Sequence, residues 1–345
     1  MVDFAGWEMP VQYSSIVDEH NAVRDAVGLF DISHMGRFQF HGHSSQAFLN
    51  SILTNDTSKL NVGDVRYSLI CGKDGGILDD VLVYRLTDHW ELVVNASNRE
   101  KIIRWLKHEA GFAAVHFRDC TLSTGMIAVQ GPQALALLKD AANLDLSAMK
   151  YYTASEMQYL ETHGVVSRTG YTGEDGFELV VPSADAERVW STLFEHGAKY
   201  GCIAAGLGCR DTLRLESAMP LYGHELNETT DPLTAGLAFA VKFNKPEYPG
   251  KAALELIKSR GVKLARVGLM LEGRRIAREE SPVHIAGHEV GKVTSGTFSP
   301  TLQKVIAMAY VPVGSSSIGT MVEVNLRGTL VPATVVALPF YKRST

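Results

Sequence analysis

Hydrophobic positions along the chain follow two different periods, which separate the predicted helices from the predicted strands. Where apolar residues recur every three or four positions, we predict helices at 15–27, 46–53, 98–110, 133–142 and 251–259. A further predicted helix carries Val189, Leu193 and Phe194 on a single stripe, and another runs from Gly206 to Pro220. Where apolar residues alternate or form short runs, we predict strands at 37–40, 67–71, 81–86, 90–95, 126–130, 156–160, 164–168 and 177–181. This mixture is typical of an α+β fold.

The pattern changes after Leu264. From there onward, alternating or wholly apolar segments are separated by turn residues, which are Gly287, Pro300, Pro312, Gly319 and Gly328. No helical period interrupts them. We therefore predict a separate all-β, barrel-like domain at 264–345.

The composition is that of an ordinary globular protein, with 46% hydrophobic residues, 21% charged residues and a net charge of -5 over 345 residues. A chain of this length predicts two or three domains, which can enclose a site between them. Because there is no basic excess, we expect no nucleic-acid partner. Because no run of about 18 apolar residues occurs, we expect no membrane span.

The four cysteines, Cys71, Cys120, Cys202 and Cys209, show no metal-binding or redox spacing, which indicates buried thiols in a reducing compartment. The first ten residues include Asp3 and lack the apolar core of a secretion signal. We therefore expect a cytoplasmic protein, or a mitochondrial matrix protein if the source is eukaryotic.

Two adjacent carboxylates, Asp79 and Asp80, follow a glycine turn and precede the apolar run Val81–Tyr84. Such a run is typical of a buried strand, and side chains alternate faces along a strand. We therefore predict that the two acids point opposite ways and that at least one faces an interior or a cleft. A buried carboxylate needs a cation or hydrogen-bond donors. Two interpretations stay open here, a chemical site or a turn acid that accepts from backbone amides.

A loop with three glycines, Gly170–Gly176, lies between two predicted strands and leads to Glu178. The glycines allow positive φ angles or the close approach of a flat ligand. Glu178 presents two acceptor oxygens, which could hold the paired donors of an amidine-like ring edge, as in a pterin or guanine. Taken alone, Glu178 is also consistent with a surface acid.

The segment Gly206–Asp211 begins a predicted helix and partly matches a dinucleotide-binding fingerprint. The third glycine and the distal acidic residue are missing, so nucleotide binding is not favoured. Arg210 lies in the first turn, where a cation opposes the helix macrodipole and needs an acidic neighbour or an anionic ligand. Asp211 could be that neighbour.

Three histidines, His34, His41 and His43, lie close together in the sequence. His41 and His43 would share one strand face, but no acidic or cysteine ligand matches them. A metal site is therefore not favoured, and no nucleophile elbow, Walker loop or H-E-x-x-H motif is present.

Six motifs together resemble a single family. They are VDFAGWEMP at 2–10, FDISHMG at 30–36, GGILDD at 75–80, GYTGEDGFE at 170–178, GLGCRDTLRLES at 206–217 and TSGTFSPTL at 294–302. From the first residue to Phe340, the chain closely resembles the glycine cleavage system T protein family of aminomethyltransferases. Cys209 replaces the usual alanine before the arginine. Family members usually carry further residues before the first motif, so we expect this chain to begin late.

The resemblance implies a three-domain cloverleaf with the folate site in its central opening. Two mixed α/β domains would comprise 1–38 plus 130–227 and 39–129 plus 228–263. The C-terminal all-β domain would comprise 264–345.

The implied activity belongs to the glycine cleavage system. Such an enzyme takes the aminomethyl group carried by the lipoyl arm of the H protein, releases ammonia and forms methylene-tetrahydrofolate. The resemblance thus implies tetrahydrofolate as co-substrate, the lipoylated H protein as partner, and no metal.

Site residues are carried over motif by motif. The second acid of GGILDD, Asp80, is implied to be the essential carboxylate beside the folate. Asp79 is then expected to bond turn amides on the opposite face. The residues implied to hold or line the folate are Glu178, Arg210, Asn95, Tyr67, Tyr171 and Met35.

Two other functions stay open. One is a folate-dependent demethylase or sarcosine-type oxidising enzyme on the same scaffold, and no attached flavin-binding region supports the oxidase version. The other is a folate-binding accessory factor for iron–sulfur assembly. Relatives of that factor carry Lys-Gly-Cys-Tyr-x-Gly-Gln-Glu where this chain has Arg168–Glu174, without the cysteine.

Overall fold

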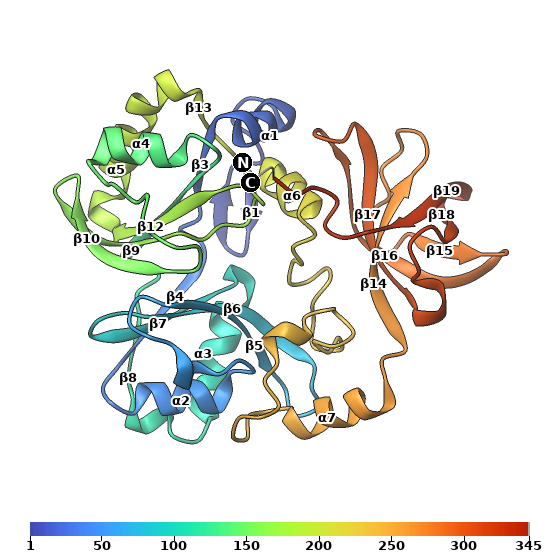
Figure 1. Ribbon diagram of the computed structural model, residues 1–345, viewed down its shortest axis with the longest axis horizontal. Coiled ribbons are helices and arrows are strands. Elements are labelled where there is room, and N and C mark those ends of the chain that lie inside the picture. Colours follow the sequence, from blue (N-terminus) through green and yellow to red (C-terminus); the bar gives the residue numbers. More distant parts are fainter. Residues whose placement is uncertain (344–345) are drawn as a thin grey trace.

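The computed structural model describes residues 1–343, which form two mixed α/β units and a closed β barrel around a common centre (Figure 1). In Figure 1 the six-stranded sheet lies at the upper left, the five-stranded sheet at the lower left and the barrel at the right. The predicted α+β class and the C-terminal all-β barrel are confirmed.

The six-stranded sheet contains strands from four separate parts of the chain. In order across the sheet they are β10 (Ala154–Tyr159), β11 (Thr162–Ser167), β12 (Gly176–Pro182), β9 (Thr124–Gln130), β3 (Val27–Asp31) and β13 (Cys202–Ala204). The helices that contact it are α1 (Ile16–Asp25), α4 (Ala134–Ala142), α5 (Ser183–Gly197) and α6 (Leu207–Glu216). Ile127 and Val129 on β9 face the core shared with α4 and α5, whereas Met126 and Ala128 face α1 and α6. This alternation sandwiches the sheet between helices.

The five-stranded sheet is covered by helices on one face. Its strands are β5 (Val65–Cys71), β6 (Ile77–Arg85), β7 (His89–Val94), β4 (Gly36–His41) and β8 (His116–Asp119). Helices α2 (Ser45–Ile52) and α3 (Arg99–His108) pack against Phe38, Val83 and Leu92. Near the ends of β5 and β6, Leu69 and Ile77 pack against the segment 226–250, which contains only one 3-10 turn, Ala238–Ala240, and against Leu254 of the helix that follows it. That segment leads into α7 (Lys251–Arg260).

Six antiparallel strands close the barrel. In order around it they are β14 (Leu264–Leu271), β17 (Lys304–Pro312), β16 (His288–Ser299), β15 (Pro282–Ile285), β18 (Met321–Leu326) and β19 (Thr329–Val336). Its outer face meets α6, where Leu215 packs against Ile306 and Met308. The N-terminal residues form a hairpin of β1 (Val2–Phe4) and β2 (Trp7–Met9). No helix within residues 1–343 is both long and apolar enough to cross a membrane.

Two local expectations are wrong. The first helix ends at Asp25 instead of residue 27, because Val27 begins the central strand β3, which the helical pattern concealed. Phe194 is 42% exposed, whereas Val189 and Leu193 are buried. Residues four apart share a helix face, and Phe194 lies about 100° further round.

Strand pairing also shifts two expected domain boundaries. β4 (Gly36–His41) belongs wholly to the five-stranded sheet and β9 (Thr124–Gln130) wholly to the six-stranded sheet. The chain therefore crosses between the sheets at 32–35 and 120–123, ahead of the boundaries expected at 38/39 and 129/130. A strand pattern shows that a strand exists but not which sheet it joins. With these shifts, we propose the division into three domains.

One buried cation fixes the segment between α6 and α7, which packs against the five-stranded sheet. Lys245 is 5% exposed, and its Nζ donates to the carbonyls of Asn50, Leu53 and Asn55 at 2.5, 2.6 and 3.0 Å. Two of these carbonyls lie at the end of α2, where helix carbonyls lack internal partners and attract cations. Lys245 thus holds the segment that carries Phe239.

The substitution Lys245→Met should lower the free energy of unfolding by about 2–3 kcal/mol, since three buried carbonyls lose their donor. Urea unfolding measures the loss. The control Lys107→Met, at an exposed position on α3, should stay within about 0.5 kcal/mol of the parent. Equal stability of the two variants would contradict this role for Lys245.

Candidate active site

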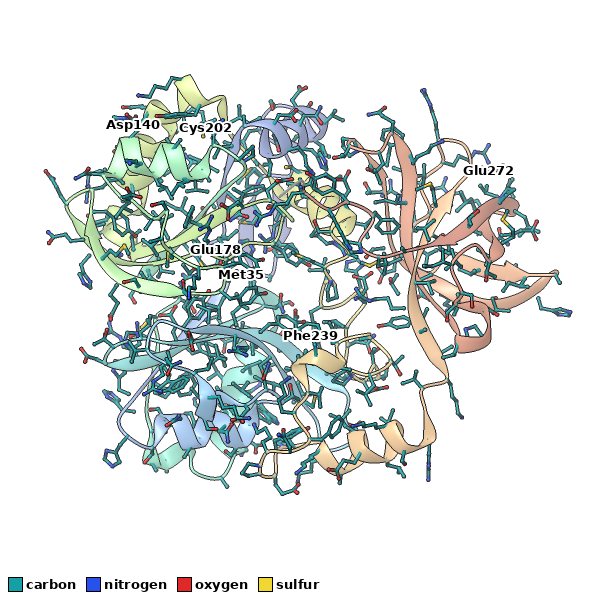
Figure 2. The ribbon with its side chains drawn as sticks, viewed as in Figure 1. Met35, Asp140, Glu178, Cys202, Phe239 and Glu272 are labelled. Carbon is teal, nitrogen blue, oxygen red and sulfur yellow. The ribbon has the colours of Figure 1, made fainter. Side chains whose placement is uncertain are left out.

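One cavity of about 350 Å³ lies where the three units meet, and all seven candidate site residues line it. They are Met35, Tyr67, Asp80, Asn95, Tyr171, Glu178 and Arg210. Figure 2 labels two of them, Met35 and Glu178, near the centre of the molecule, together with Phe239, which also lines the cavity. The structure therefore brings together residues from seven elements and loops of the chain.

The two adjacent acids alternate as predicted. Asp79 is fully buried, whereas Asp80 is half-buried and lines the cavity. The expectation that Asp79 bonds turn amides is wrong, because its donors come from the end of β7: the Asn95 backbone at 3.1 Å, the Asn95 Nδ2 at 2.8 Å and the Asn98 Nδ2 at 2.6 Å. The pairing of Leu82 with Val93 explains this, because the same register brings Asn95 beside Asp80.

Asn95 joins the two carboxylates. Its Nδ2 also donates to Asp80 Oδ1 at 2.7 Å, and Tyr67 Oη donates to Asp80 Oδ2 at 3.1 Å. Burial raises the pKa of Asp80, and the bonds from Asn95 and Tyr67 oppose the shift. Burial, and then the charge of Asp80, raise the pKa of Asp79 to about 8. Within residues 1–343 neither acid forms an ion pair, so neutral donors alone hold them.

Glu178 lies on β12 and enters the cavity with one oxygen already occupied. Thr169 Oγ1 donates to its Oε2 at 2.5 Å. Burial raises the pKa of Glu178, while the Thr169 bond and the charge of Arg210 lower it. No hydrogen bond within the described chain uses Oε1, so this oxygen can accept from a ligand.

Arg210 does not pair with its neighbour. Asp211 instead forms an ion pair with Arg214 at 2.7 Å, so the alternative in which Asp211 neutralises Arg210 is wrong. The Arg210 guanidinium lies over the Tyr171 ring, 4.7 Å from its centroid. Burial lowers the pKa of Arg210, and Tyr171 and Glu178 oppose that shift. With no carboxylate partner in residues 1–343, this cation faces the cavity with N–H groups to donate.

The glycines of the 170–176 loop serve packing within the protein. A Cβ at Gly170 would lie 2.0 Å from Gln130 Oε1, and a Cβ at Gly173, where φ is +84°, would lie 2.0 Å from Ser217 Oγ. The loop is thereby pressed against β9 and α6. Tyr171 Oη donates to the Pro220 carbonyl at 2.5 Å, which fixes the ring under Arg210.

The three histidines have no metal-binding arrangement. His34 is buried with its ring edge-on to Phe4 at 5.4 Å, and burial lowers its pKa to about 3. His41 stacks on His89 at 5.0 Å. Within the described part of the chain, no cluster of three or more His, Cys, Asp or Glu residues is arranged to hold a metal ion.

Sequence reasoning missed part of the cavity lining. Phe239 lies in a single 3-10 turn, Ala238–Ala240, which is too short to show a period. Met219 lies within the helix predicted from Gly206 to Pro220, but α6 ends at Glu216, so the expected end of that helix is wrong and Met219 lies in a cavity-lining loop. Arg266 reaches the cavity from β14 of the barrel and donates to the Ala218 carbonyl at 3.0 Å. The one sequence signal for Arg266 was that a charged residue interrupts a strand pattern that is otherwise apolar.

Comparisons with known proteins match nearly the whole chain. Residues 1–245 match the family model described as GCVT N-terminal domain, and residues 265–342 match the one described as Glycine cleavage T-protein C-terminal barrel domain. The chain is 46% identical over 344 residues to the aminomethyltransferase of Moorella thermoacetica, covering 99% of this chain and 94% of the relative. It is 47% identical over 349 residues to that of Streptomyces avermitilis, covering 99% and 94%.

A solved structure of similar fold supports the same family as the sequence matches. The glycine cleavage system aminomethyltransferase T from Bartonella henselae superposes with a TM-score of 0.92 at 34% identity, covering 99% of this chain and 94% of that chain. The fold and the matches define an enzyme that transfers a one-carbon unit, an aminomethyltransferase. The chain belongs to the glycine cleavage T-protein family, which confirms the resemblance seen in its motifs.

The substitution Tyr67→Phe should raise the pKa of Asp80 further, because a donor to the ionised carboxylate is lost. Carboxyl ¹³C NMR titration of aspartate-labelled protein measures this shift, with the signal assigned by its absence in Asp80→Asn. The control Tyr159→Phe removes a buried hydroxyl that has no hydrogen-bond partner within residues 1–343. An unmoved Asp80 midpoint in Tyr67→Phe would show that the hydroxyl does not stabilise the anion.

Proposed function

We propose that this chain moves the aminomethyl group from the lipoyl arm of the glycine cleavage H protein to tetrahydrofolate, with release of ammonia. The observation that carries the proposal is the convergence of seven side chains, implied by separate motifs, on one cavity. The full-length matches to aminomethyltransferases support the one-carbon chemistry. The expected location, cytoplasm or mitochondrial matrix, stays a prediction from the sequence.

The cavity offers matching partners for a reduced pterin. Glu178 can accept from the paired N–H groups of the amidine-like ring edge, one at its free Oε1 and one at the remaining lone pair of Oε2. The Nδ2 of Asn95 is committed to the two aspartates, which leaves its Oδ1 to accept a further ligand donor. Arg210 can donate to a ring oxygen. Met35 and Tyr171 supply apolar and aromatic surface around a flat ring.

Asp80 is proposed to act as a fixed anion. When ammonia leaves the sulfur-bound aminomethyl group, positive charge develops on the methylene carbon, and a carboxylate stabilises this state more than the starting state. At ~4 Å and an effective dielectric constant near 20, the attraction is about 4 kcal/mol, an upper bound of roughly a thousandfold in rate. Asp80 would also orient the bridging amine of the folate so that the ring nitrogen attacks the carbon.

Asp79 is proposed to position Asp80. The two carboxylates share the Asn95 Nδ2, so the buried acid helps to fix the amide that holds the cavity-facing acid. Since the pKa of Asp79 is raised further by the charge of Asp80, the pair resists double ionisation. A proton taken up by Asp79 leaves the negative charge on Asp80, beside the reacting carbon.

The substitution Asp80→Asn should lower the rate of aminomethyl transfer by about a thousandfold, because the anion is lost. The assay mixes the protein with tetrahydrofolate and aminomethyl-loaded lipoylated H protein, and follows ammonia and methylene-tetrahydrofolate. Folate affinity should change by less than about tenfold, and thermal stability should stay equal or rise, since a costly buried charge is removed. Retention of most of the transfer rate with normal folate binding would refute the role of Asp80.

The matched control is Asp79→Asn, which alters the neighbouring acid outside the cavity. Its transfer rate should fall by less than about tenfold, because the anion at position 80 remains. Its free energy of unfolding should fall, since an asparagine amide would face the donors of Asn95 and Asn98. Equal rate losses in the two folded variants would remove the distinction between the acids.

A further inference from the structure

Two of the six motifs carry polar residues whose role the cavity does not explain. The motif of α6 ends with Glu216 and Ser217, and the motif at the end of β16 contains Ser299 and Thr301. None of these four residues lines the cavity. They meet instead between α6 and the barrel, where Arg24 of α1 joins them. A role in shaping the cavity from behind would explain their place.

Arg24 donates to two separate parts of the chain besides its own helix. Its side chain is 5% exposed. Its Nη1 donates to the Thr172 carbonyl at 2.8 Å and to Glu174 Oε1 at 2.9 Å, both in the 170–176 loop. Its Nη2 donates to Glu216 Oε2 at 2.8 Å. One buried guanidinium thus joins α1 to the loop and to the end of α6.

Glu216 receives donors from the barrel as well. It is fully buried, and its Oε1 accepts from the Ser299 hydroxyl and from Thr301 N at 3.2 Å. Its Oε2 accepts from Thr301 Oγ1 at 2.8 Å and lies 3.2 Å from His20 Nε2. Burial raises the pKa of Glu216, but these donors outweigh burial and lower the pKa to about 2. The carboxylate is therefore ionised at neutral pH, and it connects the barrel to Arg24.

The chain after β19 returns from the barrel to the same place (Figure 1). We call this segment, residues 337–343, the strap. Its Leu338 and Phe340 pack into the apolar contact between α6 and the barrel. Tyr341 N then donates to the Glu216 carbonyl at 2.8 Å. The strap thereby spans the joint between the barrel and the end of α6.

The strap places an aromatic ring against Arg24. The guanidinium carbon of Arg24 lies 4.0 Å from the centroid of the Tyr341 ring. A cation is attracted to the face of an aromatic ring, and more strongly where water is excluded. Burial and the Glu174 carboxylate raise the pKa of Tyr341 to about 12, so the ring is neutral. Further along the strap, Arg343 lies 3.5 Å from Asp175. The strap therefore contacts both Arg24 and the loop to which Arg24 donates.

The loop held in this way forms one wall of the cavity. Thr172 follows Tyr171, which lines the cavity and lies under the Arg210 guanidinium. The Thr172 carbonyl accepts from Arg24 and also from Ser217 Oγ at 2.9 Å. Arg24 thus bonds the backbone one residue behind the ring that faces the ligand. The reactive acid, in contrast, is held by donors of the five-stranded sheet.

We propose that Arg24 is a positioning residue that fixes the cavity wall formed by Tyr171 and Arg210. Glu216 and the strap hold Arg24 in place. This inference rests on the proposed function and concerns the pterin end of that site. A loosened wall would lose contact with the flat ring, while the carboxylate of Asp80 would stay where it is. Loss of the clamp should therefore weaken tetrahydrofolate binding more than it slows the chemical step.

The variant Tyr341→Leu tests the strap, because it removes the aromatic face at a half-buried position. It should raise KM for tetrahydrofolate by about threefold or more and change kcat by less than about twofold, in the assay with aminomethyl-loaded H protein. Tyr341→Phe keeps the ring and should retain the parental KM. Calorimetry should show the same change in the dissociation constant of tetrahydrofolate in the absence of turnover.

The variant Arg24→Met tests the cation. It should raise KM by about tenfold or more, because charge-assisted bonds to the loop are lost, and lower kcat by less than about threefold. The matched control is Arg188→Met on α5. Arg188 also donates to a carbonyl, that of Leu160, and to a carboxylate, that of Asp185, but away from the cavity. This control should keep the parental KM.

The possible failures are distinguishable. Absence of methylene-tetrahydrofolate with the parent protein would count against the proposed function. Normal turnover by the parent, with a parental KM in Tyr341→Leu and in folded Arg24→Met, would overturn the positioning role alone, even if both variants lost thermal stability. An equal rise in KM for Tyr341→Phe and Tyr341→Leu would also overturn it. If Arg24→Met fails to fold, the two variants of Tyr341 decide.

Discussion

Two neighbouring carboxylates in one buried strand are the constraint on which the rest of this structure depends. Burial raises the free-energy cost of ionising Asp79 and Asp80, and no cation within residues 1–343 pairs with them to offset this cost. Neutral donors from Asn95, Asn98 and Tyr67 hold the pair instead. A carboxylate that is held by neutral donors is not neutralised by a cation. It can therefore interact strongly with a positive charge that develops beside it. Such preorganisation is the usual source of large rate effects in enzymes.

The other parts of the fold bring matching groups to that anion. β12 supplies Glu178, α6 supplies Arg210, and the 170–176 loop places Tyr171 beneath the arginine. The barrel closes the cavity from the third side through Arg266. Buried contacts hold these parts together, as at Arg24, which bonds the Thr172 carbonyl at 2.8 Å and Glu216 at 2.8 Å. The cavity is thus a property of the assembled units and not of any one of them.

The sequence predicted the fold class, most helices and strands, and a set of residues that the structure places in one cavity. The helices and strands were predicted from local hydrophobic patterns, whereas the site residues were predicted from the motifs. The partners of Asp79 and Arg210 were not predictable, because the register of β6 against β7 and the turn of α6 decide them. Phe239 was missed because a single 3-10 turn is too short to show a period from which its position can be inferred. Likewise, the hydrophobic pattern did not predict which of the two sheets each strand joins.

A crystal structure of the protein with tetrahydrofolate tests the central claim most directly. The account predicts the pterin edge on Glu178, with a carboxylate oxygen of Asp80 within contact distance of the atoms that receive the one-carbon unit. Folate bound outside the cavity, or bound within it with Asp80 turned away toward solvent, would contradict the account.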